Sequence, residues 1–136
     1  MKTARILSGL LGFVLLILGV QWIIDPQAAA EGLALLYFEG EGRNTLIRDF
    51  TAFFLGTSLM CFLGLLTKNY QYMVCVAIIF VIALVANIYA GVAHGAPMIV
   101  SAAISELIFS IMAITSALLM KSNSCLLYTS PSPRDS

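Results

Sequence analysis

Residues 43–50 read Arg-Asn-Thr-Leu-Ile-Arg-Asp-Phe, and they lead from an acidic loop into a long apolar segment. They carry an arginine and an aspartate, Arg48 and Asp49, into that segment. Ionisable side chains are costly at bilayer depth, where they tend to face the interior of a helix bundle and to pair with one another. The depth and the partners of these two side chains are therefore the best indication of what the protein does.

The composition of the chain is typical of a membrane protein. Its 136 residues are 60% hydrophobic and 10% charged, with a mean hydropathy of +0.98. Soluble domains are about 45–50% apolar and about 25% charged. The formal net charge is zero, which gives no reason to expect nucleic acid as a partner. We therefore expect one small all-α domain embedded in a lipid bilayer.

Four segments are long and apolar enough to cross a bilayer, for which a helix needs about 20 residues. They are residues 6–24, a segment from an Asn44 or Thr45 N-cap to Leu66, residues 70–89 or 70–91, and residues 98–120 ended by Lys121. The last two connections are short, and short connections join antiparallel neighbours. The prediction is an integral membrane bundle of four transmembrane helices in up-down-up-down order.

A short interfacial helix is predicted after the first transmembrane helix. Asp25 and Pro26 end that first helix, because proline supplies no amide proton and disfavours the helical conformation in the residue before it. Residues 28–37 mix alanine and leucine with glutamate, and they are too short and too charged to span a bilayer. We expect a helix there that caps the bundle, followed by a turn at residues 39–42.

The first apolar segment has a cleaved signal peptide as its alternative interpretation, since a basic head precedes it and small residues follow at 28–30. It is longer than the usual apolar region of about 7–15 residues, so we expect a retained helix. Trp22 near its end is expected at the membrane interface. Gly9, Gly12 and Gly19 lie near one face, where they would let another helix approach closely.

Basic residues set the expected orientation. Lys2, Arg5, Lys68 and Lys121 fall at one end of the predicted bundle, and the acidic loop falls at the other. The positive-inside rule then predicts both termini in the cytoplasm and the acidic loop outside.

The last residues are expected to be foreign to the protein. Residues 125–135 read Cys-Leu-Leu-Tyr-Thr-Ser-Pro-Ser-Pro-Arg-Asp, which looks like the translation of a transposase-based sequencing adapter. We therefore expect a transmembrane domain at residues 1–121 and a short tail at residues 122–136 that is non-native from about Cys125. The chain would then be a metagenomic fragment whose natural carboxyl terminus is unknown.

Polar residues expected in the outer half of the bundle form the candidate site. We predict that Arg48 and Glu106 approach each other and that Asp49 or Asn87 completes an intramembrane polar network. One alternative is that Arg48 extends to the headgroups, Asp49 stays in the first wet turn, and only Glu106 is buried. Another is a substrate or proton site. The wider set of polar residues expected at this depth also contains Tyr89, His94, Ser101 and Ser105.

No motif indicates catalysis. The chain has no phosphate-binding loop, nucleophile elbow, zinc-protease motif or dinucleotide fingerprint, so we expect no catalytic, cofactor or metal site and no enzyme. Cys61 and Cys75 are expected at similar depth, without the converging ligands that a metal requires. His94 is expected in an exposed loop. The aromatic residues Phe50, Phe53, Phe54, Phe62, Tyr70 and Tyr72 suit either a quinone or lipid pocket or ordinary core packing and interface anchoring.

Several of these features together resemble a known family. They are Asp25-Pro26 after the first helix, residues 43–49 leading into Phe53-Phe54-Leu55-Gly56, and Ser105-Glu106-Leu107. The chain from about residue 1 to residue 120 resembles the bacterial four-helix membrane proteins grouped as domain of unknown function 4345. That resemblance implies a bundle in a bacterial inner membrane with no established activity. A distant similarity to DoxX-like bundles implies thiol or quinone redox chemistry in some relatives, but this chain lacks the cysteine pair or cofactor motif for it.

Two functions are consistent with the sequence. In the first, the protein is a non-enzymatic membrane component whose polar network fixes the register of the helices. In the second, it is a small carrier or redox partner that binds a proton or polar solute at Glu106 and Arg48. A cavity that reaches Glu106 would favour the second, and a dry, fully paired network would favour the first. The expected partner is the lipid bilayer, with a homo-oligomer or an unidentified membrane partner left open.

Overall fold

The computed structural model describes residues 1–129, with side chains described to residue 124. All regular secondary structure in this part of the chain is helical. The helices are α1 (Lys2–Ile24), α2 (Pro26–Gly32), α3 (Glu41–Thr67), α4 (Tyr70–His94) and α5 (Val100–Thr129). All but α2 are long and apolar enough to cross a membrane. The predicted all-α class, with four long apolar helices and a short helix after the first, is confirmed.

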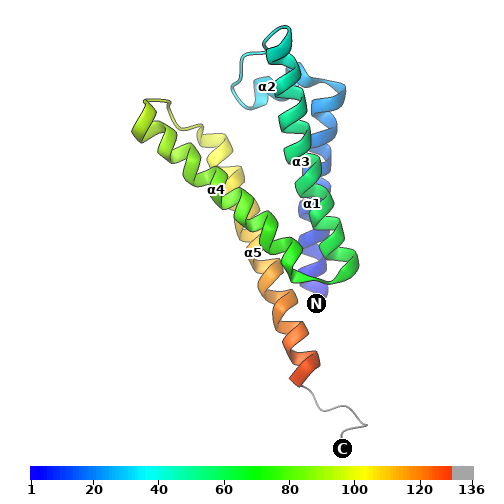
Figure 1. Cartoon of the computed structure of the whole chain (residues 1–136). Helices are drawn as coiled ribbons and strands as arrows, with labels where there is room; N and C mark the ends of the chain where they lie inside the picture. The colour runs from blue at the N-terminus through cyan, green and yellow to red at the C-terminus, as the bar shows by residue number, and fades with distance from the viewer. Residues whose placement is uncertain (130–136) are drawn as a thin grey trace, which may run out of the picture.

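The four long helices form two antiparallel pairs. α1 packs along α3, and α4 packs along α5. Figure 1 shows the pairs meeting near the amino terminus and the α3–α4 turn, and diverging towards the end that carries α2. Contacts of α1 with α5 and of α3 with α4 hold the pairs together. The up-down-up-down order is as predicted, but the bundle is a wedge that widens towards α2.

Close contact between α1 and α3 depends on glycines and serines. A Cβ atom built on Gly19 would lie 3.2 Å from the backbone nitrogen of Leu55, so the two backbones approach there as only glycine allows. Nearer the amino terminus, Ser58 donates a hydrogen bond to the carbonyl oxygen of Gly12 at 2.7 Å. Ser8 donates to the carbonyl oxygen of Cys61 at 2.6 Å. The predicted close approach along the glycine face of the first helix is confirmed.

The second pair of helices joins the first through small residues at the amino-terminal end. Ser116 of α5 donates a buried hydrogen bond to the carbonyl oxygen of Ala4 in α1 at 2.8 Å. Ser8 of α1 also contacts the sulfur of Met73 in α4 at 3.2 Å. Among the described side chains, no equivalent hydrogen bonds between the helix pairs are present at the α2 end of the wedge. Large apolar side chains cover the outward faces of the helices, as lipid contact requires.

The α2 helix is shorter than predicted. It begins at Pro26, with the Asp25 carboxylate accepting from the Ala28 amide at 3.2 Å, and it ends at Gly32. The prediction placed a helix at residues 28–37. Ala34 has a φ of 57°, and this left-handed residue ends any helical continuation, so the chain beyond it runs to Gly40 without regular structure.

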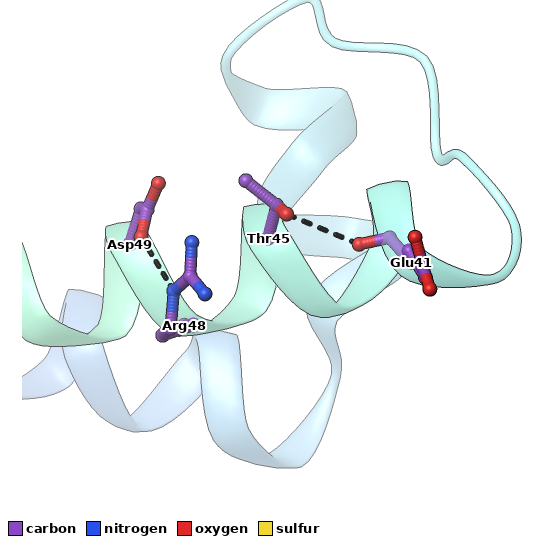
Figure 2. A network of polar contacts seen from close by, with 4 residues as sticks. All are labelled: Glu41, Thr45, Arg48 and Asp49. Carbon is purple, nitrogen blue, oxygen red and sulfur yellow. Dashed lines mark hydrogen bonds and ion pairs between the residues drawn. The ribbon is translucent and has the colours of Figure 1, made fainter.

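The α3 helix begins earlier than predicted. Gly40, at a φ of 62°, precedes the first helical residue, Glu41, so the predicted turn at residues 39–42 is partly helical. Thr45 is not the N-cap, because its hydroxyl donates to the carbonyl oxygen of Glu41 at 3.1 Å one turn inside the helix (Figure 2). Residues 48 and 49 therefore lie about two turns inside the helix, not one.

The last two helices extend past their predicted ends. α4 runs to His94, and Gly95 at a φ of 64° ends it in the left-handed conformation. α5 starts at Val100 and runs to Thr129, not to residue 120, because residues 121–129 contain no glycine or proline to stop a helix. α5 thus crosses the predicted boundary at residue 122. The adapter-like stretch lies outside the described side chains, and its backbone beyond Thr129 is outside the described residues.

Candidate functional site

A cavity of about 520 Å³ lies where the two helix pairs diverge. This volume is within the roughly 300–1,000 Å³ of small-molecule sites. Its lining is mostly apolar and comes from all five helices and the residue after α2. The lining residues are Leu18, Gln21, Trp22, Ala29, Gly32, Leu33, Asp49, Phe50, Phe53, Phe54, Phe80, Ala83, Ser101, Ala102, Ser105, Glu106 and Phe109. The wedge shape of the fold therefore creates a partly open cavity at the α2 end.

Six aromatic rings form a continuous run along the cavity wall, here called the aromatic chain. It consists of Trp22, Phe50, Phe54, Phe53, Phe80 and Phe109 in order of contact. Neighbouring ring centroids are 4.8, 6.5, 5.1, 5.4 and 5.2 Å apart. These are the separations at which aromatic pairs attract one another. The aromatic chain connects α1 to α5 through α3 and α4, so it gives the cavity a rigid apolar wall.

The Trp22 side chain lies inside the helix bundle. It is only 1% exposed, and its ring stacks on Phe50 with an interplanar angle of 9°. Trp22 does lie near the end of α1, and its place at the membrane interface stays a prediction. The side chain points inward because α3 offers an aromatic partner on that side.

Glu106 brings a carboxylate to the cavity. Its Oε2 atom is buried and has no hydrogen-bond partner. Ser110 donates to the backbone carbonyl of Glu106 at 2.7 Å and does not reach the carboxylate. A buried polar atom without a partner costs free energy, so such atoms are rare unless a ligand or water completes them. Glu106 therefore presents to the cavity a buried hydrogen-bond acceptor without a partner.

Serine hydroxyls lie beside Glu106 on the same helix face. Ser105 lines the cavity and donates to the carbonyl oxygen of Ser101 at 3.1 Å, so its oxygen lone pairs remain able to accept a bond. The α5 lining positions are 101, 102, 105, 106 and 109. This spacing places them along one side of a helix. The same spacing is visible in the sequence, and with Phe109 it could have predicted this face.

Arg48 and Asp49 pair with each other. The Nε atom of Arg48 lies 2.9 Å from Oδ1 of Asp49, and the two side chains are 65% and 59% exposed (Figure 2). Asp49 also lines the cavity, whereas Arg48 does not. Among the described side chains no ion pair joins Arg48 to Glu106, so the predicted pair is not formed there. Arg48 takes the adjacent carboxylate of its own helix, and Glu106 lies on α5, across the cavity.

The Asn87 side chain holds the α4–α5 connection by hydrogen bonds to its backbone. Its amide donates to the carbonyl oxygen of Ile99 at 3.2 Å and accepts from the Ile99 amide at 3.1 Å. These two bonds fix the chain just before α5, on which Glu106 lies seven residues further along. The Asn87 side chain also lies within hydrogen-bonding reach of the Glu106 carboxylate, but it does not line the cavity. The four residues of the predicted network are thus not joined into one network by the contacts of the described side chains.

The other polar candidates lie away from the cavity. Tyr89 and His94 contact each other edge to face, with centroids 5.7 Å apart, and both are exposed. His94 is the last residue of α4 and not a loop residue. Cys61 is buried, Cys75 is exposed, and neither forms a disulfide within the described part of the chain.

The cavity has an acidic character. Its two ionisable lining residues are Asp49 and Glu106, and among the described residues no lysine, arginine or histidine lines it. Asp49 is already paired with Arg48 outside the cavity. The arrangement can therefore accept hydrogen bonds or positive charge at Glu106 while apolar groups rest on the aromatic chain. Comparisons with protein-family models, with curated proteins and with solved structures find no match to this chain.

Proposed function

We propose that this protein binds a small, largely apolar molecule with one polar group in the cavity between its helix pairs, within a membrane. The observation that carries the proposal is the buried, unpartnered Oε2 atom of Glu106 at the wall of a cavity of about 520 Å³. Ligand sites typically combine such an apolar lining with a few polar groups that fix orientation. The protein would act as a small binding protein or carrier and not as an enzyme.

The alternative of a purely structural polar network has less support. A network that only fixes helix register is expected to be dry and fully paired, since a buried polar atom left unsatisfied costs about 1–3 kcal/mol. Glu106 has an unpaired buried oxygen, and Arg48 is paired elsewhere. In membranes, ionisable residues of this kind usually mark a binding site or an ion pathway.

We place the cavity in the outer half of a bacterial inner membrane, with both termini in the cytoplasm. Basic residues support this orientation: Lys2 and Arg5 are at the start of α1 and Lys68 follows α3. These helix ends lie opposite the end that carries α2 (Figure 1). Four helices long and apolar enough to cross a bilayer support the membrane location.

Binding can be measured through Trp22. It is the single tryptophan of the chain and it lines the cavity, so its emission reports contact with a heavy-atom quencher there. We expect a neutral probe, a bromonaphthalene carrying a hydroxymethyl group, to quench Trp22 with a saturable dependence on concentration. The measurement uses the full chain in detergent micelles.

A cavity-filling variant separates specific binding from partition into the micelle. Ala102→Phe adds a ring inside the cavity and is expected to weaken the binding of the neutral probe at least about tenfold, which is about 1.4 kcal/mol. Ala86→Phe makes the same change at an exposed position of α4 outside the cavity and is expected to bind as the native chain does. Unsaturable quenching, or equal binding by both variants, would refute the proposal.

A further inference from the structure

We infer that the polar group of the ligand is a cation, such as an ammonium group carried on an aromatic or other apolar body. This inference rests on the proposed function of the cavity and adds the chemical class of what it binds. Three features of the lining carry it, namely its charge, its free hydrogen-bond acceptors and its aromatic faces.

The ionisable side chains that line the cavity are all acidic. Asp49 and Glu106 contribute carboxylates, and no basic side chain of the described residues lines the cavity. Arg48 is the nearest basic residue in sequence, but it pairs with Asp49 on the exposed side of α3. Glu106 is therefore left without a protein counter-charge, and a carboxylate with one buried, unpartnered oxygen is stabilised by a cation that enters beside it. An anionic ligand would meet the unpaired carboxylate of Glu106 and no basic side chain among the lining residues.

The free acceptors of the cavity suit a group that donates hydrogen bonds. Oε2 of Glu106 has no donor, and the hydroxyl oxygen of Ser105 has already used its proton on Ser101. An ammonium group carries three donors and no acceptor, so it can bond both oxygens at once. Bonds between an ammonium donor and a carboxylate are about twice as strong as neutral ones.

The aromatic chain supplies the third feature. Phe109 follows Glu106 by three positions on α5, so both side chains lie on one helix face. Phe80 contacts Phe109 at a centroid distance of 5.2 Å and is 1% exposed. Ring faces attract cations, and the attraction grows when water is excluded. The same rings give an apolar body a surface to stack on, so one ligand can satisfy both the charge and the apolar wall.

The test compares three probes that share one bromonaphthalene body and differ only in their head groups. These groups are aminomethyl, hydroxymethyl and carboxylate, which are cationic, neutral and anionic at neutral pH. Quenching of Trp22 in the native chain is expected to show the aminomethyl probe binding about tenfold more tightly than the hydroxymethyl probe. The carboxylate probe is expected to bind at least about tenfold more weakly than the hydroxymethyl probe.

Glu106→Gln assigns the preference to one side chain. This change keeps the shape and removes the charge, and it is expected to weaken binding of the aminomethyl probe about tenfold while changing the hydroxymethyl probe less than about twofold. The control is Glu39→Gln, because the side chain of Glu39 is 92% exposed and lies outside the cavity lining. The control is expected to leave the order of the three probes unchanged.

The two proposals fail in different ways. Saturable quenching by all three probes with equal affinity, still lost in Ala102→Phe, would overturn the cation inference and leave the cavity as a binding site. An aminomethyl preference that survives in Glu106→Gln would also overturn it. If none of the three probes quenches Trp22 with a saturable dependence on concentration, the proposed function itself is overturned. The comparison of probes on the native chain needs no variant, so it decides the inference even if Glu106→Gln does not fold.

Discussion

Phe80→Ala is expected to lower the free energy of unfolding by about 3–5 kcal/mol, the range for deleting a large buried aromatic side chain. Phe80 is 1% exposed and joins Phe53 of α3 to Phe109 of α5, at centroid distances of 5.4 and 5.2 Å. Its removal interrupts the aromatic chain at the point where the second helix pair contacts the first. The loss is measured by denaturant unfolding in detergent micelles, followed by far-ultraviolet circular dichroism.

The matched control is Phe13→Ala. Phe13 is an exposed aromatic residue in the apolar part of α1, where a membrane or micelle would surround it before and after unfolding. We expect this control to change the unfolding free energy by less than about 0.5 kcal/mol. Equal losses for the two variants would mean that Phe80 does not hold the helix pairs together.

Gly19→Ala is expected to destabilise the protein by about 1–3 kcal/mol, although alanine normally favours helices over glycine. The new Cβ atom would clash with the side chain of Leu55, and it would lie 3.2 Å from the backbone nitrogen of the same residue. A side chain can turn away, but the backbone of α3 has to move. The separation of α1 from α3 is expected to increase, and the unfolding free energy measures the cost.

Gly56→Ala is the matched control for this prediction. It makes the same substitution inside α3, but a Cβ atom there would meet nothing within 4 Å. The control is therefore expected to leave the free energy of unfolding unchanged, or to raise it by up to about 1 kcal/mol through helix propensity. If both alanine variants behave alike, the backbones of α1 and α3 are not in the close contact described above.

Hydropathy and small residues were enough to predict most of the fold. Four apolar segments of the right length and the short connections between them indicate an antiparallel helical bundle, because a bilayer permits few other structures. The glycine face of the first helix was also predictable, since Gly12 and Gly19 fall along one side of it. Each of these features depends on residue spacing within one segment.

The helix ends were less predictable because single residues set them. Ala34 and Gly40 adopt positive φ values that end α2 and precede α3, and alanine carries no signal for such a conformation. Starting α3 at Glu41 moved Arg48 and Asp49 about one turn deeper than expected. Arg48 and Asp49, which are adjacent in sequence, pair with each other. A prediction from depth alone did not consider this pairing.

The candidate site was predicted only in part. Glu106 was recognised as an intramembrane carboxylate, and Asp49, Ser101 and Ser105 were placed at the correct end of the bundle. The cavity itself was not predicted, because it results from the angle between two helix pairs, and hydropathy does not encode that angle. Trp22, Phe80 and Phe109 were missed for the same reason. Their inward direction depends on which helix lies opposite each of them.

The most direct test of the cavity is to locate the bromine atom of the aminomethyl probe by anomalous diffraction from crystals of the full chain. The bromine is expected among the rings of Phe53, Phe80 and Phe109, with the ammonium group within hydrogen-bonding distance of the Glu106 carboxylate. Bromine found only on the outer, lipid-facing surface of the helices, with the space beside Glu106 filled by protein side chains, would contradict a ligand site between the helix pairs.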